Sequence, residues 1–109
     1  HYKQAIKINP GYAAAYYNIG ITYTKKKMYD PAIDSLKKTI ELNPDDESAH
    51  YNLGIVYSKK RMYDDAILEY QKVIDANPGL PSVHYNREKG MLLQARREVY
   101  LYKKLNSRT

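Results

Sequence analysis

The sequence predicts an all-α protein in which antiparallel helix hairpins stack into a solenoid that ends in an atypical C-terminal capping helix. First, the dipeptide Asn-Pro recurs at a spacing of 34 residues. Second, the segments between these dipeptides match one another at the same spacing, and the matched residues include Gly20 and Gly54, Met28 and Met62, Asp30 and Asp64, and Ala32 and Ala66. Third, each unit carries the periodicity and cap residues of two helices. Because one hairpin cannot bury its apolar side alone, neighbouring units must stack.

The first helix of unit one is predicted from about Ala13 to Lys25. Ile19, Gly20 and Tyr23 recur along one side of it at helical spacing. Gly20, together with Ala32 on the next helix, is small enough to let the two helices of the hairpin approach closely. Unit two repeats this arrangement.

The second helix of unit one is predicted to start at Asp30, a good N-cap residue, with Pro31 as its first helical residue. It runs to about Leu42, where the next Asn-Pro pair stops it. In unit two, Asp64 is the corresponding cap and Pro78 the corresponding stop.

These residues resemble the tetratricopeptide repeat (TPR), a 34-residue helical hairpin. Its pattern of aromatic, Leu-Gly, Tyr, Ala, aromatic and Pro is matched by Tyr16, Ile19, Gly20, Tyr23, Ala32, Leu36 and Pro44, and again by His50, Leu53, Gly54, Tyr57, Ala66, Tyr70 and Pro78. The resemblance implies a TPR-like α-solenoid. Lys27 and Arg61 stand at a loop position that usually holds Gly, so a left-handed backbone there costs up to about 1 kcal/mol.

The whole chain, residues 1–109, is expected to form a single TPR-like domain. Its predicted parts are residues 1–10 as the second helix of a partial repeat, 13–46 and 47–80 as full repeats, and 81–109 as an incomplete third repeat or C-terminal cap. Because the sequence starts inside a motif, we expect either a piece of a longer array or an N-terminal helix whose partner lies in another molecule.

The third copy departs from the pattern after Asn86, since Arg87 and Glu88 stand where Leu and Gly are expected. The segment EKGMLLQA that follows resembles the family's turn into its second helix, displaced by five residues. A deletion would make this region a short hairpin. The alternative that we favour is one helix from Ser82 to Leu105 through Gly90, because an interior Gly costs only about 1 kcal/mol. That helix would carry an apolar stripe of Met91, Leu92, Ala95, Val99 and Tyr102.

Composition and charge narrow the function classes. The net charge is +6, and the basic excess lies at the two ends, since residues 81–109 hold seven Lys or Arg and two acids. This asymmetry is the only feature that favours nucleic acid, so we expect nucleic acid to be an unlikely partner. No apolar run is long enough to span a bilayer and no leader is visible, so we expect a soluble protein without a membrane partner. The absence of cysteine excludes disulfides. The compartment is unknown, with the cytoplasm favoured.

No constellation for catalysis is visible, so we expect no enzyme activity and no cofactor. His50 and His84 lie one repeat apart at a packing position, and without a third ligand a structural role is favoured over metal binding. The acids at residues 45–47 are expected to cap a helix. The basic runs at residues 25–27 and 59–61 are predicted to be solvated turns, with contact to phosphate or an acidic partner as the alternative.

A double ladder is the most informative candidate site. Tyr17, Tyr51 and Tyr85 recur at a spacing of 34, and each is followed by an Asn, namely Asn18, Asn52 and Asn86. The family resemblance implies that both positions face or border the concave groove. An Asn amide can donate to and accept from an extended peptide backbone. The remaining lining is predicted as Ala14, Ile21, Thr24, Lys25, Ser48, Ile55, Ser58 and Lys59. Alternatively, each Asn only ties neighbouring first helices together.

A second family use, the clamp for acidic C-termini of chaperones, requires Lys, Asn, Asn, Lys and Arg on three first helices. At the matching positions this chain has Tyr17, Ile21, Asn52, Ser82 and Asn86, of which only Asn52 is of the required type. We therefore expect no such clamp.

The leading hypothesis is a non-enzymatic scaffold that binds a peptide or partner helix, and hence a protein, in the concave groove. Self-assembly into a homo-oligomer through the incomplete terminal repeats is a structural alternative. A targeting module of a larger enzyme is a further possibility that flanking sequence would decide.

Overall fold

The computed structural model describes residues 11–107. The partial repeat predicted for residues 1–10 lies outside the described residues. The described chain forms helices α2 (Gly11–Lys25), α3 (Tyr29–Leu42), α4 (Glu47–Lys59), α5 (Tyr63–Ala76) and α6 (Pro81–Asn106), with no strand between residues 11 and 107. The predicted all-α helical solenoid is therefore confirmed.

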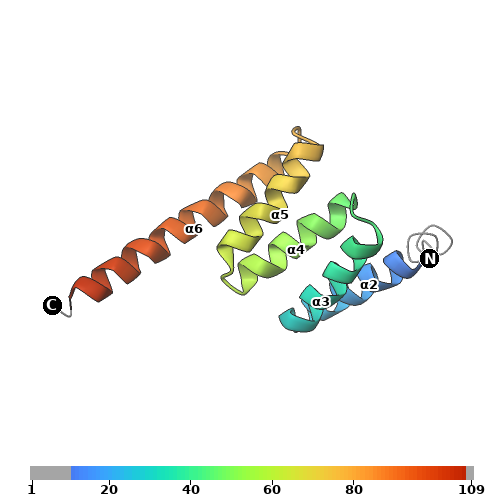
Figure 1. Cartoon of the computed structure of the whole chain (residues 1–109), viewed down its shortest axis with the longest axis horizontal. Helices are drawn as coiled ribbons and strands as arrows, with labels where there is room; N and C mark the ends of the chain where they lie inside the picture. Colours follow the sequence, from blue (N-terminus) through green and yellow to red (C-terminus); the bar gives the residue numbers. More distant parts are fainter. Residues whose placement is uncertain (1–10, 108–109) are drawn as a thin grey trace.

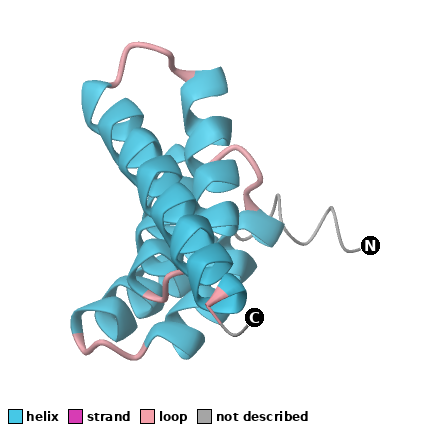
Figure 2. Ribbon diagram, turned by 90° about the vertical axis from the view of Figure 1, so that its left-hand side faces the viewer, coloured by secondary structure: helices cyan, strands magenta, loops and turns pink. Residues whose placement is uncertain are grey.

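The helices succeed one another along the long axis of an elongated molecule measuring 60 × 30 × 27 Å (Figure 1). Each helix packs against its neighbour in the chain, so α2 with α3 and α4 with α5 form the two hairpins, and α6 packs against α5. Figure 2 looks along the row from the C-terminal end and shows the connecting loops at two edges of the stack. The buried residues form one continuous core through both hairpins, which is what stacked repeats require.

The turn inside each hairpin has a left-handed residue, as the resemblance to the family suggested. Lys27 has a φ of 61° and Arg61 a φ of 63°. In both turns the next backbone N–H folds back onto the preceding helix, with Met28 N donating to Tyr23 O at 2.9 Å and Met62 N donating to Tyr57 O at 2.8 Å. These bonds satisfy carbonyls at the helix ends. They offset the cost of placing a side chain in the left-handed region.

The N-caps predicted at Asp30 and Asp64 are wrong. Helices α3 and α5 begin at Tyr29 and Tyr63, so a methionine occupies each cap position and makes no side-chain cap bond. The left-handed turn has already redirected the chain at that point, and the carbonyl of each methionine accepts the first helical N–H bond. The two aspartates lie in the first turn, where they still favour the positive end of the helix dipole.

The cap predicted at the start of α4 is correct. The carboxylate of Asp46 accepts a hydrogen bond from the backbone N–H of Ala49 at 3.0 Å, and Glu47 lies in the first turn. This start follows an extended residue in the loop, so a side-chain cap has room to form.

Close approach of the two helices in a hairpin depends on glycine, as predicted. A Cβ added to Gly20 would lie 2.8 Å from Leu36 Cγ, and one added to Gly54 would lie 2.5 Å from Tyr70 Cε1. The two hairpins therefore use the same device with different partners, a leucine in the first and a tyrosine in the second.

The leucine-type position of the repeat is buried in one hairpin and not in the other. Leu53 is 2% exposed between its neighbours, whereas Ile19, predicted on the packed side of α2, is 44% exposed. In the periodic arrangement, the helix that covers this position belongs to the preceding unit. For Ile19 that unit is predicted for residues 1–10, outside the described part of the chain.

Helix α6 is continuous through Gly90, which confirms the favoured alternative for the third copy; no short hairpin forms there. Pro81 occupies its first turn, a position that favours proline. Gly90 is buried, and a Cβ there would meet Ile67 Cγ1 at an ordinary contact distance of 3.5 Å. Arg87 stands where the second repeat buries Leu53, and its Nε is buried without a hydrogen-bond partner among the described residues. The third copy therefore packs its N-terminal half on α5 without the buried leucine of the second repeat.

Candidate functional site

The asparagine and tyrosine ladders are joined to each other by hydrogen bonds. Asn52 Nδ2 on α4 donates to the hydroxyl of Tyr17 on α2 at 3.0 Å. One repeat later, Asn86 Nδ2 on α6 donates to the hydroxyl of Tyr51 on α4, again at 3.0 Å. Each bond ties a first helix to the first helix before it. The interpretation that these asparagines connect neighbouring repeats is therefore observed directly.

These bonds limit what the amide of Asn52 can offer to a ligand. Its Nδ2 also donates to the backbone oxygen of Ser48 at 2.8 Å. The two bonds use both amide hydrogens, so the carbonyl oxygen Oδ1 is the group left to accept an N–H from a peptide backbone. The expected combination of donating and accepting is thereby reduced to accepting.

The predicted lining residues all reach the surface of the described chain. The exposed ones are Ala14, Asn18, Lys25, Ser48, Lys59 and Tyr85, and the half-buried ones are Tyr17, Ile21, Thr24, Tyr51, Asn52, Ile55, Ser58 and Asn86. We call these fourteen residues of α2, α4 and α6 the groove face. The hydroxyl of Thr24 donates its hydrogen to the backbone oxygen of Gly20 at 2.8 Å, so it can only accept a hydrogen bond from a ligand.

A cavity of about 410 Å³ lies at the C-terminal part of the groove face. Four predicted residues line it, Ile55, Ser58, Lys59 and Asn86, together with Tyr70, Lys89, Gly90 and Leu93. The predicted residues of α2 do not line it. Sequence reasoning missed Lys89 and Leu93, although they follow Ile55 and Lys59 by 34 residues and the repeat register could have identified them.

Tyr70 on α5 forms the buried wall of this cavity. Its ring is 2% exposed and lies 6.1 Å from the ring of Tyr51 at an angle of 51°. Its hydroxyl is 3.4 Å from Ser58 Oγ. Burial raises the pKa of the Tyr70 phenol above its ordinary value of 10.0, while the Ser58 hydroxyl acts in the opposite direction. At neutral pH the cavity wall therefore presents an uncharged hydroxyl, and the charge in the cavity comes from Lys59 and Lys89 at its rim.

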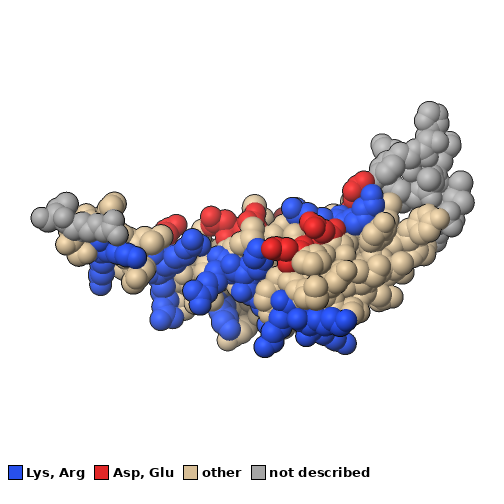
Figure 3. Space-filling view, turned by 90° about the horizontal axis from the view of Figure 1, so that it is seen from below, with Lys and Arg blue, Asp and Glu red and all other residues tan. Residues whose placement is uncertain are grey.

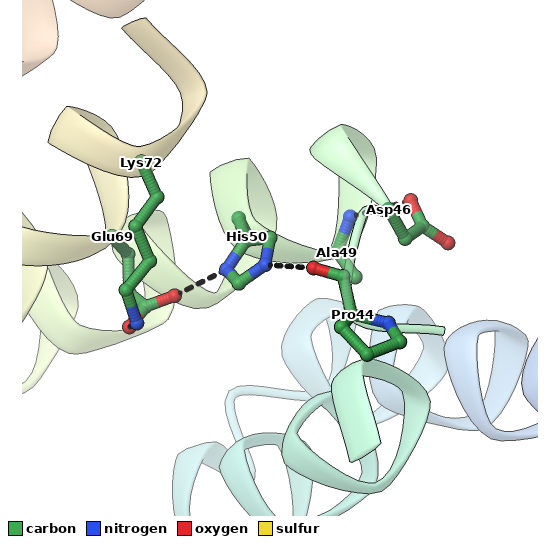
Figure 4. Close-up of polar contacts among 6 residues, drawn as sticks. All are labelled: Pro44, Asp46, Ala49, His50, Glu69 and Lys72. Atoms are coloured by element: carbon green, nitrogen blue, oxygen red, sulfur yellow. Dashed lines mark hydrogen bonds and ion pairs between the residues drawn. The ribbon is translucent and has the colours of Figure 1, made fainter. Parts of the chain in front are cut away.

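The two matched histidines have structural roles. His50 is buried, and its Nε2 donates to the carbonyl of Pro44 at 2.8 Å, which ties α4 to the loop before it (Figure 4). Its Nδ1 lies 2.7 Å from Glu69 Oε1 on α5, and Lys72 Nζ lies 3.1 Å from the other carboxylate oxygen. Because the carbonyl can only accept, Nε2 carries the proton of that bond, and Nδ1 makes the contact with Glu69. His84 repeats only the carbonyl bond, to Pro78 at 2.7 Å.

The matched histidines give a paired prediction. We expect His50→Ala to lower the free energy of unfolding by about 1–2 kcal/mol, because the change removes the His50 contact of Glu69 Oε1 and of the Pro44 carbonyl, while Lys72 still pairs with the other carboxylate oxygen. His84→Ala should lower it by less than about 1 kcal/mol, since His84 is half-buried and bonds a single carbonyl. Urea denaturation followed by circular dichroism measures both. Equal losses would show that the Glu69 contact contributes nothing.

Metal and membrane sites are not found in the described chain. Across residues 11–107, His, Asp and Glu side chains form no group of three or more able to hold a metal ion. Within the same residues, no helix combines the length and the apolar character needed to cross a bilayer.

Comparisons with known proteins find the same repeat and the same fold. The family model described as tetratricopeptide repeat matches residues 13–46 and 48–80. A crystal structure of MamA protein superposes with a TM-score of 0.74 at 32% identity, covering 84% of this chain and 51% of that one. A second MamA crystal structure has a TM-score of 0.66 at 28% identity, covering 86% of this chain and 61% of that one.

The same fold occurs in a larger assembly. The crystal structure of the APC/C hetero-tetramer Cut9-Hcn1 matches with a TM-score of 0.72 at 28% identity, covering 75% of this chain and 16% of that one. The chain thus spans less than two thirds of the length of each of these proteins. No curated protein sequence matches it significantly.

Proposed function

Because the chain belongs to the tetratricopeptide repeat family, we propose that it is a protein-interaction scaffold that binds a peptide or a partner helix along its groove face. The observation that carries the proposal is the cavity of about 410 Å³, where lining residues predicted from the repeat pattern on α4 and α6 come together. The similar structure of Cut9-Hcn1 is that of a hetero-tetramer, which supports protein partners for this fold. No catalytic reaction is proposed.

The groove face suits an extended peptide for a physical reason. The asparagine oxygens can accept N–H groups of a main chain at a regular spacing. In the ladder bonds, both Asn52 and Asn86 donate through Nδ2, so their Oδ1 atoms are not used in these bonds. The Tyr51 ring and Ile55 beside them give broad apolar contact, and both are half-buried. Backbone contacts of this kind provide affinity, while the cavity next to them selects a side chain.

This mode of binding predicts a loss that does not depend on peptide sequence. Replacing Asn18 and Asn52 by Ala should weaken binding by about 1 kcal/mol per lost hydrogen bond. The probes are fluorescein-labelled peptides of unlike sequence, selected from a random library by binding to the native chain, and fluorescence anisotropy measures their affinity. If neither Asn18→Ala nor Asn52→Ala changes the affinity, and both variants keep native circular dichroism, the groove does not bind peptides through their main chain.

Tyr17→Phe is the matched control within the ladder. It removes the hydroxyl that accepts from Asn52 and leaves the Asn52 amide in place. We expect a small loss of stability and no loss of peptide affinity, which separates the structural part of the ladder from ligand binding. A random library that yields no binder to the native chain would contradict the proposal itself.

Self-assembly is the second candidate, and the observation in its favour is the exposure of apolar residues on α6, where Leu92 is 58% exposed and Val99 52% exposed. A homo-oligomer requires a second copy to cover them. Light scattering across a concentration series distinguishes the two candidates, since a scaffold that does not self-associate keeps one mass at all concentrations.

A further inference from the structure

The outer side of α6 carries an apolar seam that the repeats leave uncovered. Leu92, Ala95, Val99 and Tyr102 follow one another at spacings of three, four and three residues, which is the alternation of a and d positions in a coiled coil. Leu92, Val99 and Tyr102 are 58%, 52% and 68% exposed, and Ala95 is exposed too. We call these four residues the α6 seam.

The α6 seam faces away from the hairpins. The residues of α6 that contact the rest of the molecule lie on its opposite side, where Val83 and Gly90 are buried against α5. Further along that side, Arg97 Nη1 donates to the backbone oxygen of Arg61 at 3.2 Å. These contacts fix the direction of α6, so the seam is held in solvent as a preformed helical surface.

One edge of the seam is lined by cations. Lys89, Arg96 and Lys103 are exposed and follow one another at seven-residue spacing, which places them in a single row beside the seam. A shallow depression of about 420 Å³ is lined by Ala95 and Val99 of the seam, by Arg96 and Lys103 of this basic row, and by Tyr100. Figure 3 shows Lys and Arg side chains along one edge of the molecule, including the part formed by projecting α6.

The charges beside the seam indicate which kind of helix can cover it. A second α6 packed antiparallel would place one basic row directly opposite the other. Packed parallel, it would set the three cations against the other edge of the seam, which carries Met91, Glu98 and Leu105 and so offers one acid. A helix with a row of Glu or Asp beside its apolar residues meets all three cations with opposite charge.

We propose that the α6 seam is a docking surface for an acidic amphipathic helix of another protein. The partner's apolar residues pack on Leu92, Ala95, Val99 and Tyr102, and its acids lie along the basic row. Apart from Lys89, which also stands at the rim of the cavity in the groove face, this surface lies outside the groove face.

The test uses a synthetic helical peptide with Leu at its a and d positions and Glu at its e and g positions, which like charges keep monomeric. Its partner probe has the same sequence with Lys in place of Glu. We expect the acidic peptide to bind the native chain at least about tenfold more tightly than the basic one, as measured by fluorescence anisotropy. Added salt should weaken the acidic complex, because its pairs are solvent-exposed.

Two double variants, with a third as their matched control, locate the site. Arg96→Glu with Lys103→Glu should reverse the preference between the peptides, whereas the matched control Lys26→Glu with Lys37→Glu changes the net charge equally at exposed positions far from α6 and should preserve it. Leu92→Lys with Val99→Lys should abolish binding of the acidic peptide while circular dichroism stays native. Equal affinity for both peptides, binding of neither, or an oligomer of the native chain that this last variant dissociates in sedimentation velocity would overturn the proposal.

Discussion

Replacing Tyr70 by Ala should lower the free energy of unfolding by about 3–5 kcal/mol, the range for removing a large aromatic side chain from a core. Tyr70 is the largest fully buried side chain of the described residues, packed under Gly54 and beside Tyr51. Its removal opens a void between α4 and α5 that joins the cavity of the groove face. Urea denaturation measures the loss.

Tyr70→Phe is the control for the hydroxyl. The contact of that hydroxyl with Ser58 Oγ is long, at 3.4 Å, so its loss should lower stability by less than about 1 kcal/mol. If Tyr70→Ala and Tyr70→Phe lower the free energy of unfolding by similar amounts, the aromatic ring and its close packing on Gly54 do not stabilise the hairpin.

The second large effect is expected at Gly54. Gly54→Ala places a methyl group 2.5 Å from Tyr70 Cε1, and the buried ring cannot rotate away, so the helices of the second hairpin must separate. We expect a net loss of about 2 kcal/mol, since the strain of overpacking exceeds the gain of about 1 kcal/mol in helix propensity.

Gly90→Ala is the same substitution where the structure has room. The new Cβ meets Ile67 at 3.5 Å, an ordinary contact, and α6 gains the helix propensity of alanine. Stability should rise by up to about 1 kcal/mol. If Gly90→Ala and Gly54→Ala lowered the free energy of unfolding equally, the loss would come from the change in backbone freedom and not from the distance to the neighbouring side chain.

The hairpins and their spacing could be predicted because the residues that decide them are local and repeated. Small residues such as Gly20 allow close packing at every copy, and the Asn-Pro pairs stop each second helix. The predicted caps at Asp30 and Asp64 were wrong because a left-handed residue in the preceding turn determines where each helix starts. The residue preferences for an N-cap position carry no information about that backbone conformation.

The candidate site could be predicted only in part. Its asparagines and tyrosines are visible as a 34-residue repeat, but the bond from Asn52 to Tyr17 links side chains 35 residues apart and depends on how first helices pack across repeats. The cavity depends on Gly90, where the second repeat has the buried Val56, and on α6 running straight past α5. Neither is a property of one repeat considered alone.

Because α6 is one continuous helix, it is much longer than the other helices of the described chain. With 26 residues it spans about 39 Å, whereas the 14 residues of α5 span about 21 Å, so α6 extends well beyond the hairpin that supports it. A helix is stiff over such a length, and its base is anchored by Val83 and Gly90. A molecule bound to the distal half of α6 would therefore be kept at a fixed separation and orientation from a molecule bound to the groove face.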